Sequence, residues 1–188
     1  MCRTLAMLMA MLVFVGAVSF ASEKPMVEFA IGAKTTEPCQ VAYQKYTGPY
    51  SGIPKAIGDV AAWAATQGFI MPGLIMGEYY NSPMEVDSTK LEWAVMYPVF
   101  EPLSGFPKDL PGPGSIRKLE PTLIVYTYFQ GPYENVGAAY MRLFTWVFQN
   151  GYQPAGAMRE IYWSDPAKTQ NSKPLTEIQL PVMKAAQN

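Results

Sequence analysis

Glu177 is the acidic residue of this sequence that is best placed to do chemistry. It lies in residues 176–182, T-E-I-Q-L-P-V, where polar and apolar residues alternate as they do in a half-buried strand. We expect Ile178 and Leu180 to pack against helices, so Glu177 should project from the opposite face toward a cleft. The alternative is an ordinary solvated glutamate on a strand.

Aromatic residues in other strand-like segments could enclose such an acid. Period-two spacing places Tyr126 with Tyr128, Trp93 with Tyr97, and Tyr162 with Glu160 on shared faces. Aromatic rings hold flat or cationic guests, and a cation–π contact contributes about 0.5–2 kcal/mol. The expected ligand-binding residues are therefore Glu177, Tyr126, Tyr128, Tyr162, Trp93 and Tyr97.

An acid enclosed by aromatic rings has more than one use. In its ionised form it holds a cation, and with its pKa raised by burial it acts as a general base or acid. In an enzyme, Glu177 would activate water and a tyrosine such as Tyr162 would donate to the leaving atom. A protein-interaction module with a filled cleft and an exposed apolar patch is a third possibility.

The amino-acid composition excludes several kinds of catalytic and metal-binding site. The chain has no histidine, which excludes Ser-His-Asp triads, Cys-His pairs and His-ligated zinc or haem. Beyond Cys2 it has a single cysteine, Cys39, expected to be a buried apolar residue, with an intermolecular disulfide as the alternative. We therefore expect neither a metal nor a cofactor. A net charge of −1 without basic runs also argues against nucleic acid as a partner.

The first 21 residues read as a signal peptide rather than as part of the fold. Arg3 precedes an apolar run from Leu5 to Phe20, and small residues lie at the expected cleavage site after Ala21. The protein is thus expected to be periplasmic or secreted, with residues 22–188 as a single domain. An uncleaved membrane anchor is the alternative.

An internal repeat predicts the architecture. Residues 43–73 align with residues 126–156 without a gap, at a shift of 83 residues from Tyr43 to Tyr126. Identical residues include the Gly-Pro-Tyr turn, one tryptophan and two glycines, and a one-residue slip then aligns Glu78 with Glu160. We expect an α+β domain of two strand–helix–strand–strand units, with an antiparallel sheet and a pseudo-twofold cleft. The halves would span about 27–100 and 116–182, joined by an irregular linker at 101–115.

Local patterns place the elements within each half. Strands are expected at 41–47 and 123–130, before each Gly-Pro turn, and a helix is expected after it, ending near Gly68 or Gly151. Further extended segments are expected at 73–80, 90–100, 155–163 and 175–182, and one more at 28–36.

These motifs resemble the GyrI-like, or AraC-type effector-binding, domain family, which is related to the SOUL haem-binding proteins. The resemblance rests on residues 176–182, on Gly131-Pro132-Tyr133 and on Glu160-Ile161-Tyr162, and it runs from about residue 27 to 182. It implies a small-molecule-binding fold in which the last-strand glutamate, here Glu177, meets lipophilic cations among tyrosines and tryptophans. Some family members are fused to a DNA-binding domain, and others inhibit gyrase or hydrolyse small electrophiles. A signal peptide would remove this protein from cytoplasmic regulation.

Overall fold

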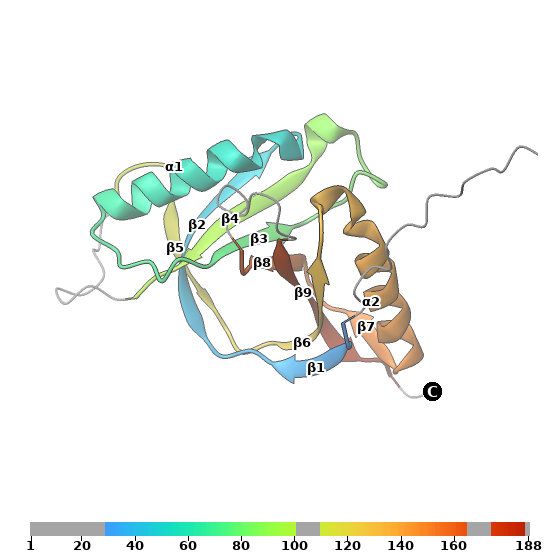
Figure 1. Cartoon of the computed structure of the whole chain (residues 1–188). Helices are drawn as coiled ribbons and strands as arrows, with labels where there is room; N and C mark the ends of the chain where they lie inside the picture. The colour runs from blue at the N-terminus through green and yellow to red at the C-terminus, as the bar shows by residue number, and fades with distance from the viewer. Residues whose placement is uncertain (1–28, 101–109, 165–173, 187–188) are drawn as a thin grey trace, which may run out of the picture.

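The computed structural model describes residues 29–100, 110–164 and 174–186 (Figure 1). The expected signal peptide at 1–21 and residues 101–109 of the expected linker lie outside these ranges. Among the helices that the structure describes, none combines the length and apolar character needed to cross a membrane.

The chain forms one antiparallel sheet and two helices, which confirms the α+β prediction. The strands are β1 (Gly32–Thr35), β2 (Cys39–Thr47), β3 (Ile75–Tyr79), β4 (Glu92–Pro98), β5 (Ser115–Leu119), β6 (Leu123–Gln130), β7 (Tyr152–Pro154), β8 (Met158–Tyr162) and β9 (Leu175–Lys184). Their order in the sheet is β1-β6-β9-β8-β3-β4-β2-β5, and β7 pairs with β9. The sequence did not predict β5 or β7.

Both halves share one order of main elements, apart from the 3-10 turn η2 (Ser88–Lys90) between β3 and β4 and the strand β7 between α2 and β8. In the first half, β2 is followed by the 3-10 turn η1 (Tyr50–Gly52), the helix α1 (Ile53–Thr66), β3 and β4. In the second, β6 is followed by η3 (Tyr133–Asn135), α2 (Gly137–Gln149), β8 and β9. The halves meet where β3 pairs with β8, at the centre of the sheet. A pseudo-twofold relation between them stays a prediction.

Each helix forms because one stripe of apolar residues packs on the sheet. In α1 the buried residues are Ala56, Val60, Trp63 and Ala64, and in α2 they are Ala139, Leu143 and Val147. Gly68 and Gly151 follow the two helices with φ of 77° and 71°, a left-handed conformation that glycine adopts without strain. The predicted helix ends are therefore confirmed.

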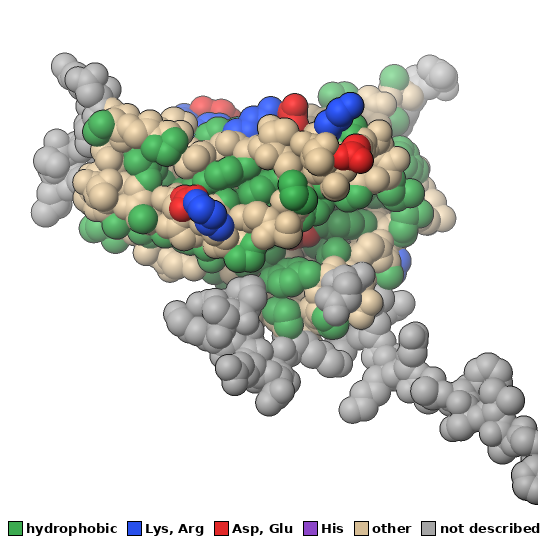
Figure 2. All heavy atoms as spheres, turned by 90° about the horizontal axis from the view of Figure 1, so that it is seen from above, with side chains coloured by type: hydrophobic (Ala, Val, Ile, Leu, Met, Phe, Trp, Pro, Cys, Tyr) green, Lys and Arg blue, Asp and Glu red, His purple; other side chains and the backbone are tan. Residues whose placement is uncertain are grey.

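Both helices cover the same face of the sheet, which we call the helix face (Figure 1). Ile178 and Leu180 point to this face and pack beneath α2, as their alternation predicted. Trp93, Val95 and Tyr97 of β4 lie on it beneath α1. Seen from above, hydrophobic side chains are widespread on this side of the molecule, and the charged groups are scattered (Figure 2).

The opposite face, which we call the inner face, is also enclosed. β1 pairs with β6 and β2 pairs with β5, so two consecutive strands run along two others as one bent ribbon that links the edges of the sheet (Figure 1). The Thr36 amide donates to the Thr122 carbonyl at the bend, at 2.9 Å. Val41 and Met96 are fully buried on this face, and Cys39 beside them is a half-buried free thiol whose pKa is raised by burial.

Candidate functional site

The sheet separates the six predicted ligand-binding residues into two groups. Glu177, Tyr126 and Tyr128 lie on the inner face, where Tyr128 pairs directly with Glu177 and Tyr126 with Gln179. Tyr162, Trp93 and Tyr97 lie on the helix face. Because a sheet stands between the two groups, the six side chains do not line one common pocket.

Glu177 already holds a cation from its own chain. Its side chain is 2% exposed, and Lys34 Nζ lies 2.7 Å from its Oε1. The same ammonium lies over the Tyr126 ring, 4.1 Å from the ring centroid. Trp163 Nε1 and Gln179 Nε2 also donate to the carboxylate, at 3.3 and 2.9 Å. Lys34 therefore occupies the position in which a cationic guest of Glu177 and Tyr126 would bind.

A second buried glutamate on the inner face, Glu78, is also paired. Arg117 Nη2 lies 2.7 Å from Oε2, and Arg159 Nε lies 2.9 Å from Oε1. Burial raises the pKa of Glu78, but hydrogen bonds from Tyr80, Arg159 and Arg117 outweigh it and leave the pKa below its usual value. This network connects β3, β5 and β8 across the inner face, so its role is to stabilise the fold.

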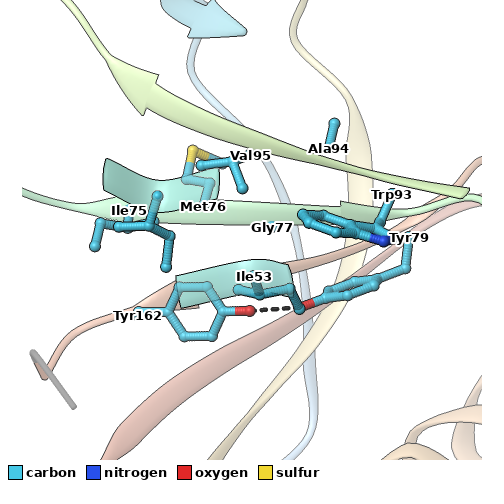
Figure 3. Close-up of a pocket in the computed structure, with 10 residues that line it drawn as sticks. Ile53, Ile75, Met76, Gly77, Tyr79, Trp93, Ala94, Val95 and Tyr162 are labelled. Carbon is cyan, nitrogen blue, oxygen red and sulfur yellow. Dashed lines mark hydrogen bonds between the residues drawn. The ribbon is translucent and has the colours of Figure 1, made fainter. Parts of the chain in front are cut away.

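The third buried glutamate, Glu160, has a different environment. It lies on the helix face of β8, is 4% exposed, and accepts hydrogen bonds from three phenols. Tyr162 and Tyr79 donate to Oε2 at 2.7 and 3.2 Å, and Tyr140 of α2 donates to Oε1. The Tyr79 and Tyr162 hydroxyls are 2.5 Å apart, and Figure 3 shows the two phenols pointing toward each other. We call Glu160 and these three tyrosines the tyrosine cluster.

Two further tyrosines extend the tyrosine cluster from the turns before the helices. The Tyr50 ring meets Tyr79 edge to face at 5.3 Å between centroids, and the Tyr133 ring meets Tyr162 in the same way at 5.8 Å. Both belong to the repeated Gly-Pro-Tyr turn, so the repeat supplies one ring from each half. These contacts place an aromatic wall on both sides of the central acid.

The tyrosine cluster contains only one glutamate because the position that corresponds to Glu160 in the first half is a glycine, Gly77. It pairs with Glu160 across β3 and β8, and the 83-residue shift aligns the same two positions. A Cβ atom at position 77 would lie 2.9 Å from the Tyr79 hydroxyl and 3.0 Å from that of Tyr162. The one-residue slip that aligned Glu78 with Glu160 is therefore wrong for the fold, because the two acids lie on opposite faces.

Burial sets the protonation of the phenols. It raises the pKa of Tyr79 and of Tyr162 well above the usual value, and the nearby Glu160 carboxylate raises both further. The pKa of Tyr140 is raised by the same two causes. The three phenols therefore stay protonated at neutral pH and act as hydrogen-bond donors.

The hollow beside the tyrosine cluster is small. The residues that line it include Ile53, Ile57, Ile75, Tyr79, Trp93, Val95 and Tyr162, and it is too narrow to hold a water molecule (Figure 3). Trp93 and Tyr162 from the predicted set thus meet here, whereas the Tyr97 hydroxyl lies deeper under α1 and donates to the Ile57 carbonyl at 3.3 Å. Glu160 is not among the residues that line this hollow, and its side chain is enclosed by the described residues around it.

Glu160, Tyr79 and Tyr140 were not among the ligand-binding residues predicted from the sequence. Two sequence patterns could have identified the tyrosines. The 83-residue shift without a slip aligns Tyr79 with Tyr162, and Tyr140 lies on the apolar stripe of its helix. Within the described ranges, no group of three or more carboxylates and thiols is arranged to bind a metal ion.

Comparison with known proteins shows one family. The sequence profile of the GyrI-like small molecule binding domain matches residues 31–183. A search of curated protein sequences finds no match.

Solved structures share the fold at low identity. The C-terminal domain of EcmrR is 24% identical with a TM-score of 0.73, covering 84% of this chain and 99% of that one. In the EcmrR–DNA complex the match is 23% identical with a TM-score of 0.72, and it covers 84% of this chain but only 58% of the longer protein. A hydrolase from Listeria innocua is 16% identical (TM-score 0.63; 81% and 91% covered). SAV2435 bound to tetraphenylphosphonium is 14% identical (TM-score 0.50; 82% and 94% covered).

Proposed function

The chain belongs to the GyrI-like small molecule binding domain family, and we propose that its tyrosine cluster binds a lipophilic, aromatic cation. One observation carries this proposal. Of the three buried glutamates, Glu78 and Glu177 are each paired with a basic side chain, whereas Glu160 has no ion-pair partner among the described residues. A buried carboxylate is costly without a counter-charge, so a cationic ligand supplies what the protein itself leaves out.

The surroundings of Glu160 favour an apolar body on that cation. Tyrosine rings stand on both sides of the acid, and Trp93, Ile53 and Ile75 line the adjoining hollow. Aromatic faces attract cations and also remove apolar surface from water. The proposed ligand is therefore a delocalised or bulky organic cation rather than a small hydrated ion.

The compartment is a separate part of the proposal. The apolar segment at 5–20 supports export, so the ligand would be met outside the cytoplasm. Fusion of a reporter that is active only outside the cytoplasm to residues 1–30 tests this part. Activity that disappears when Leu5 to Phe20 is deleted supports export, and an inactive fusion argues against it.

Tetraphenylphosphonium is the probe for the binding test, because a structural relative carries it in its solved structure. Calorimetric titration should show binding to the wild-type protein, and Glu160→Gln should weaken it about tenfold or more, since the neutral amide no longer attracts the cation. Glu177→Gln is the matched control, and it should leave the affinity within about twofold because that acid already binds Lys34.

The titrations show whether Glu160 or Glu177 binds the cation. Loss of binding in Glu177→Gln but not in Glu160→Gln would move the site to the inner face. If wild-type protein that gives a native thermal transition does not bind the probe, the cation-binding proposal is wrong, and the interaction-module alternative gains support.

A hydrolase is the second candidate, because a carboxylate and a phenol converge at 2.7 Å in an enclosed site. Glu160 would take a proton from a water molecule while the water oxygen adds to an electrophilic carbon of the substrate. The Tyr162 and Tyr79 hydroxyls would donate hydrogen bonds to the leaving oxygen of the substrate. An activated ester and an epoxide are suitable first substrates. Turnover that is lost in Glu160→Gln, with kcat lowered more than KM is raised in Tyr162→Phe, supports this candidate.

A further inference from the structure

A groove runs along the outer side of α2. The residues that line it are Ile31, Met141, Arg142, Thr145, Trp146 and Gln149, and its volume is about 300 Å³. Two large apolar side chains of the same helix, Met141 and Phe148, are 65% and 62% exposed, and Arg142 is the one charged residue of α2. A surface helix normally carries charged or polar residues on its outer face, so this face of α2 is unusual for a helix in water.

The corresponding helix of the first half has a different outer face. At the 83-residue shift, Met141 and Phe148 of α2 correspond to Gly58 and Ala65 of α1. These α1 positions are also exposed, but they carry little or no apolar side chain. The large apolar groups on α2 are therefore not required for packing a helix at this place in the fold.

Trp63 of α1, the counterpart of Trp146, shows what covers a tryptophan at this position. It is 7% exposed, and its Nε1 donates to the Pro111 carbonyl at 2.8 Å. Gly112 and Gly114 of the same segment lie so close to the indole that a Cβ atom at either position would clash with the ring. The chain immediately before β5 therefore lies directly on Trp63.

The chain before β1 is the counterpart of this covering segment. β1 pairs with β6 as β5 pairs with β2, and the 83-residue shift aligns Gly32 with Ser115. Residues 27–31 thus correspond to residues 110–114. Trp146, however, is only half-buried, and among the described residues its indole stacks on Tyr152 at 6.0 Å but donates no hydrogen bond.

The described chain begins beside the groove. Ile31 lines it, and Arg142 Nη2 donates to the Phe29 carbonyl at 3.2 Å. Residues 22–28, S-E-K-P-M-V-E, precede this point and lie outside the described ranges. An extended segment of this length spans about 23 Å, whereas the groove follows the helix for about 12 Å. The segment is therefore long enough to cover the groove.

We propose that residues 22–28 bind in this groove and cover Trp146 with the apolar pair Met26 and Val27. This removes apolar surface on both sides from water, as the segment before β5 does at Trp63. The acidic residues Glu23 and Glu28 complement the single arginine of α2.

The inference does not depend on the proposed function of the tyrosine cluster. It also holds with or without cleavage after Ala21, since residues 22–28 are present in both forms. Because Tyr140 of the tyrosine cluster lies on the same helix, a covered outer face would hold α2 and this phenol against the sheet.

The rate of thiol labelling tests the proposal. Thr145→Cys places a thiol in the groove of the full chain, in which Cys2 and Cys39 are replaced by serine. Met26→Asp together with Val27→Asp should release the segment, because burying a carboxylate against apolar groups is unfavourable. The thiol should react with a maleimide about tenfold more slowly with the native segment than with the aspartate variant. Tenfold protection corresponds to a groove that is covered about nine-tenths of the time.

Ala62→Cys is the matched control, because Ala62 has the corresponding exposed position on α1. Its labelling rate should be the same with either N-terminal segment. A cooperative thermal transition in each variant shows that the protein is folded.

The possible results separate the occupants of the groove. Protection of Thr145→Cys that is lost in the aspartate variant and independent of protein concentration supports the proposal. Equal labelling rates with either segment overturn it. Protection that increases with protein concentration, together with a dimer in sedimentation, also overturns it, because a second copy of the chain then covers the groove. Phosphonium binding at Glu160 is measured separately and stands or fails without this result.

Discussion

Gly77 and Glu160 face each other across the central strand pair β3–β8 and occupy corresponding positions in the two halves. The glycine leaves the space in which the Tyr79 and Tyr162 hydroxyls meet, and the glutamate accepts hydrogen bonds from both. The two corresponding positions at the centre of the sheet thus hold one acid instead of two. A single acid with aromatic rings on two sides would give the proposed cationic ligand one preferred orientation.

Gly77→Ala should disrupt the tyrosine cluster. The new methyl group would lie 2.9 Å from the Tyr79 hydroxyl, so the phenols must move away from Glu160. We expect the free energy of unfolding to fall by about 1–3 kcal/mol, as for other overpacked sites. Denaturant unfolding measures this. Gly58→Ala is the control, since a Cβ there meets nothing within 4 Å on an exposed helix position and should stabilise by about 0.5–1 kcal/mol. Equal effects of the two substitutions would contradict the predicted clash.

Lys34→Met should reveal the internal ion pair on the inner face. The substitution leaves the buried Glu177 carboxylate without its cation, although Trp163 and Gln179 still donate to it. Since Lys34 is 41% exposed, the expected loss in unfolding free energy is moderate, about 1–2 kcal/mol. The double variant Lys34→Met/Glu177→Gln should lose less than the sum of the single variants, which a double-mutant cycle measures. The exposed pair of Lys55 and Asp59 gives the control, because Lys55→Met should change stability by under about 0.5 kcal/mol. Strict additivity would show that the pair is not coupled.

The Glu78 network should make the protein sensitive to acid. The pKa of Glu78 is lowered in the folded state, so below the ordinary value of 4.5 the unfolded chain binds more protons than the folded one. The stabilising contribution is therefore complete above pH 4.5 and is lost as the pH falls toward the folded-state pKa. Unfolding followed at a series of acid pH values measures this slope. Glu78→Gln should flatten it and lower stability at neutral pH, whereas Glu92→Gln, in an exposed pair with Lys45, should do neither. An unchanged slope in Glu78→Gln would rule out this assignment.

The phenols of the tyrosine cluster should resist ionisation by alkali. The pKa values of Tyr79, Tyr140 and Tyr162 are raised above the ordinary 10.0, so the unfolded state loses protons first and stability falls as the pH rises above 10.0. An ultraviolet titration of phenolate should show these phenols ionising only together with unfolding. Glu160→Gln removes one cause of the raised pKa and should let ionisation start at lower pH. A titration in which every tyrosine ionises near pH 10 in the folded protein would contradict the burial of this cluster.

The sequence by itself determined the local elements and the faces of the strands. The repeat and the Gly-Pro-Tyr turns predicted β2, α1, β6 and α2, and alternation placed Glu177 on the face away from the helices. These features follow from local backbone preferences and from burying apolar residues, which a short stretch of chain specifies.

Only the tertiary structure decided which of the buried glutamates has no basic partner among the described residues. Lys34 meets Glu177 across 143 residues of sequence, and Tyr79 meets Glu160 across 81. Alternation gives the face of a residue but not its neighbour, because the neighbour depends on which strands pair and in which register. The bent ribbon of β1–β2 with β5–β6 brings Lys34 to Glu177, and the pairing of β3 with β8 brings the two phenols to Glu160. The physical reason is that the partners of a buried charge are the groups within hydrogen-bond distance in space, and these can come from any part of the chain.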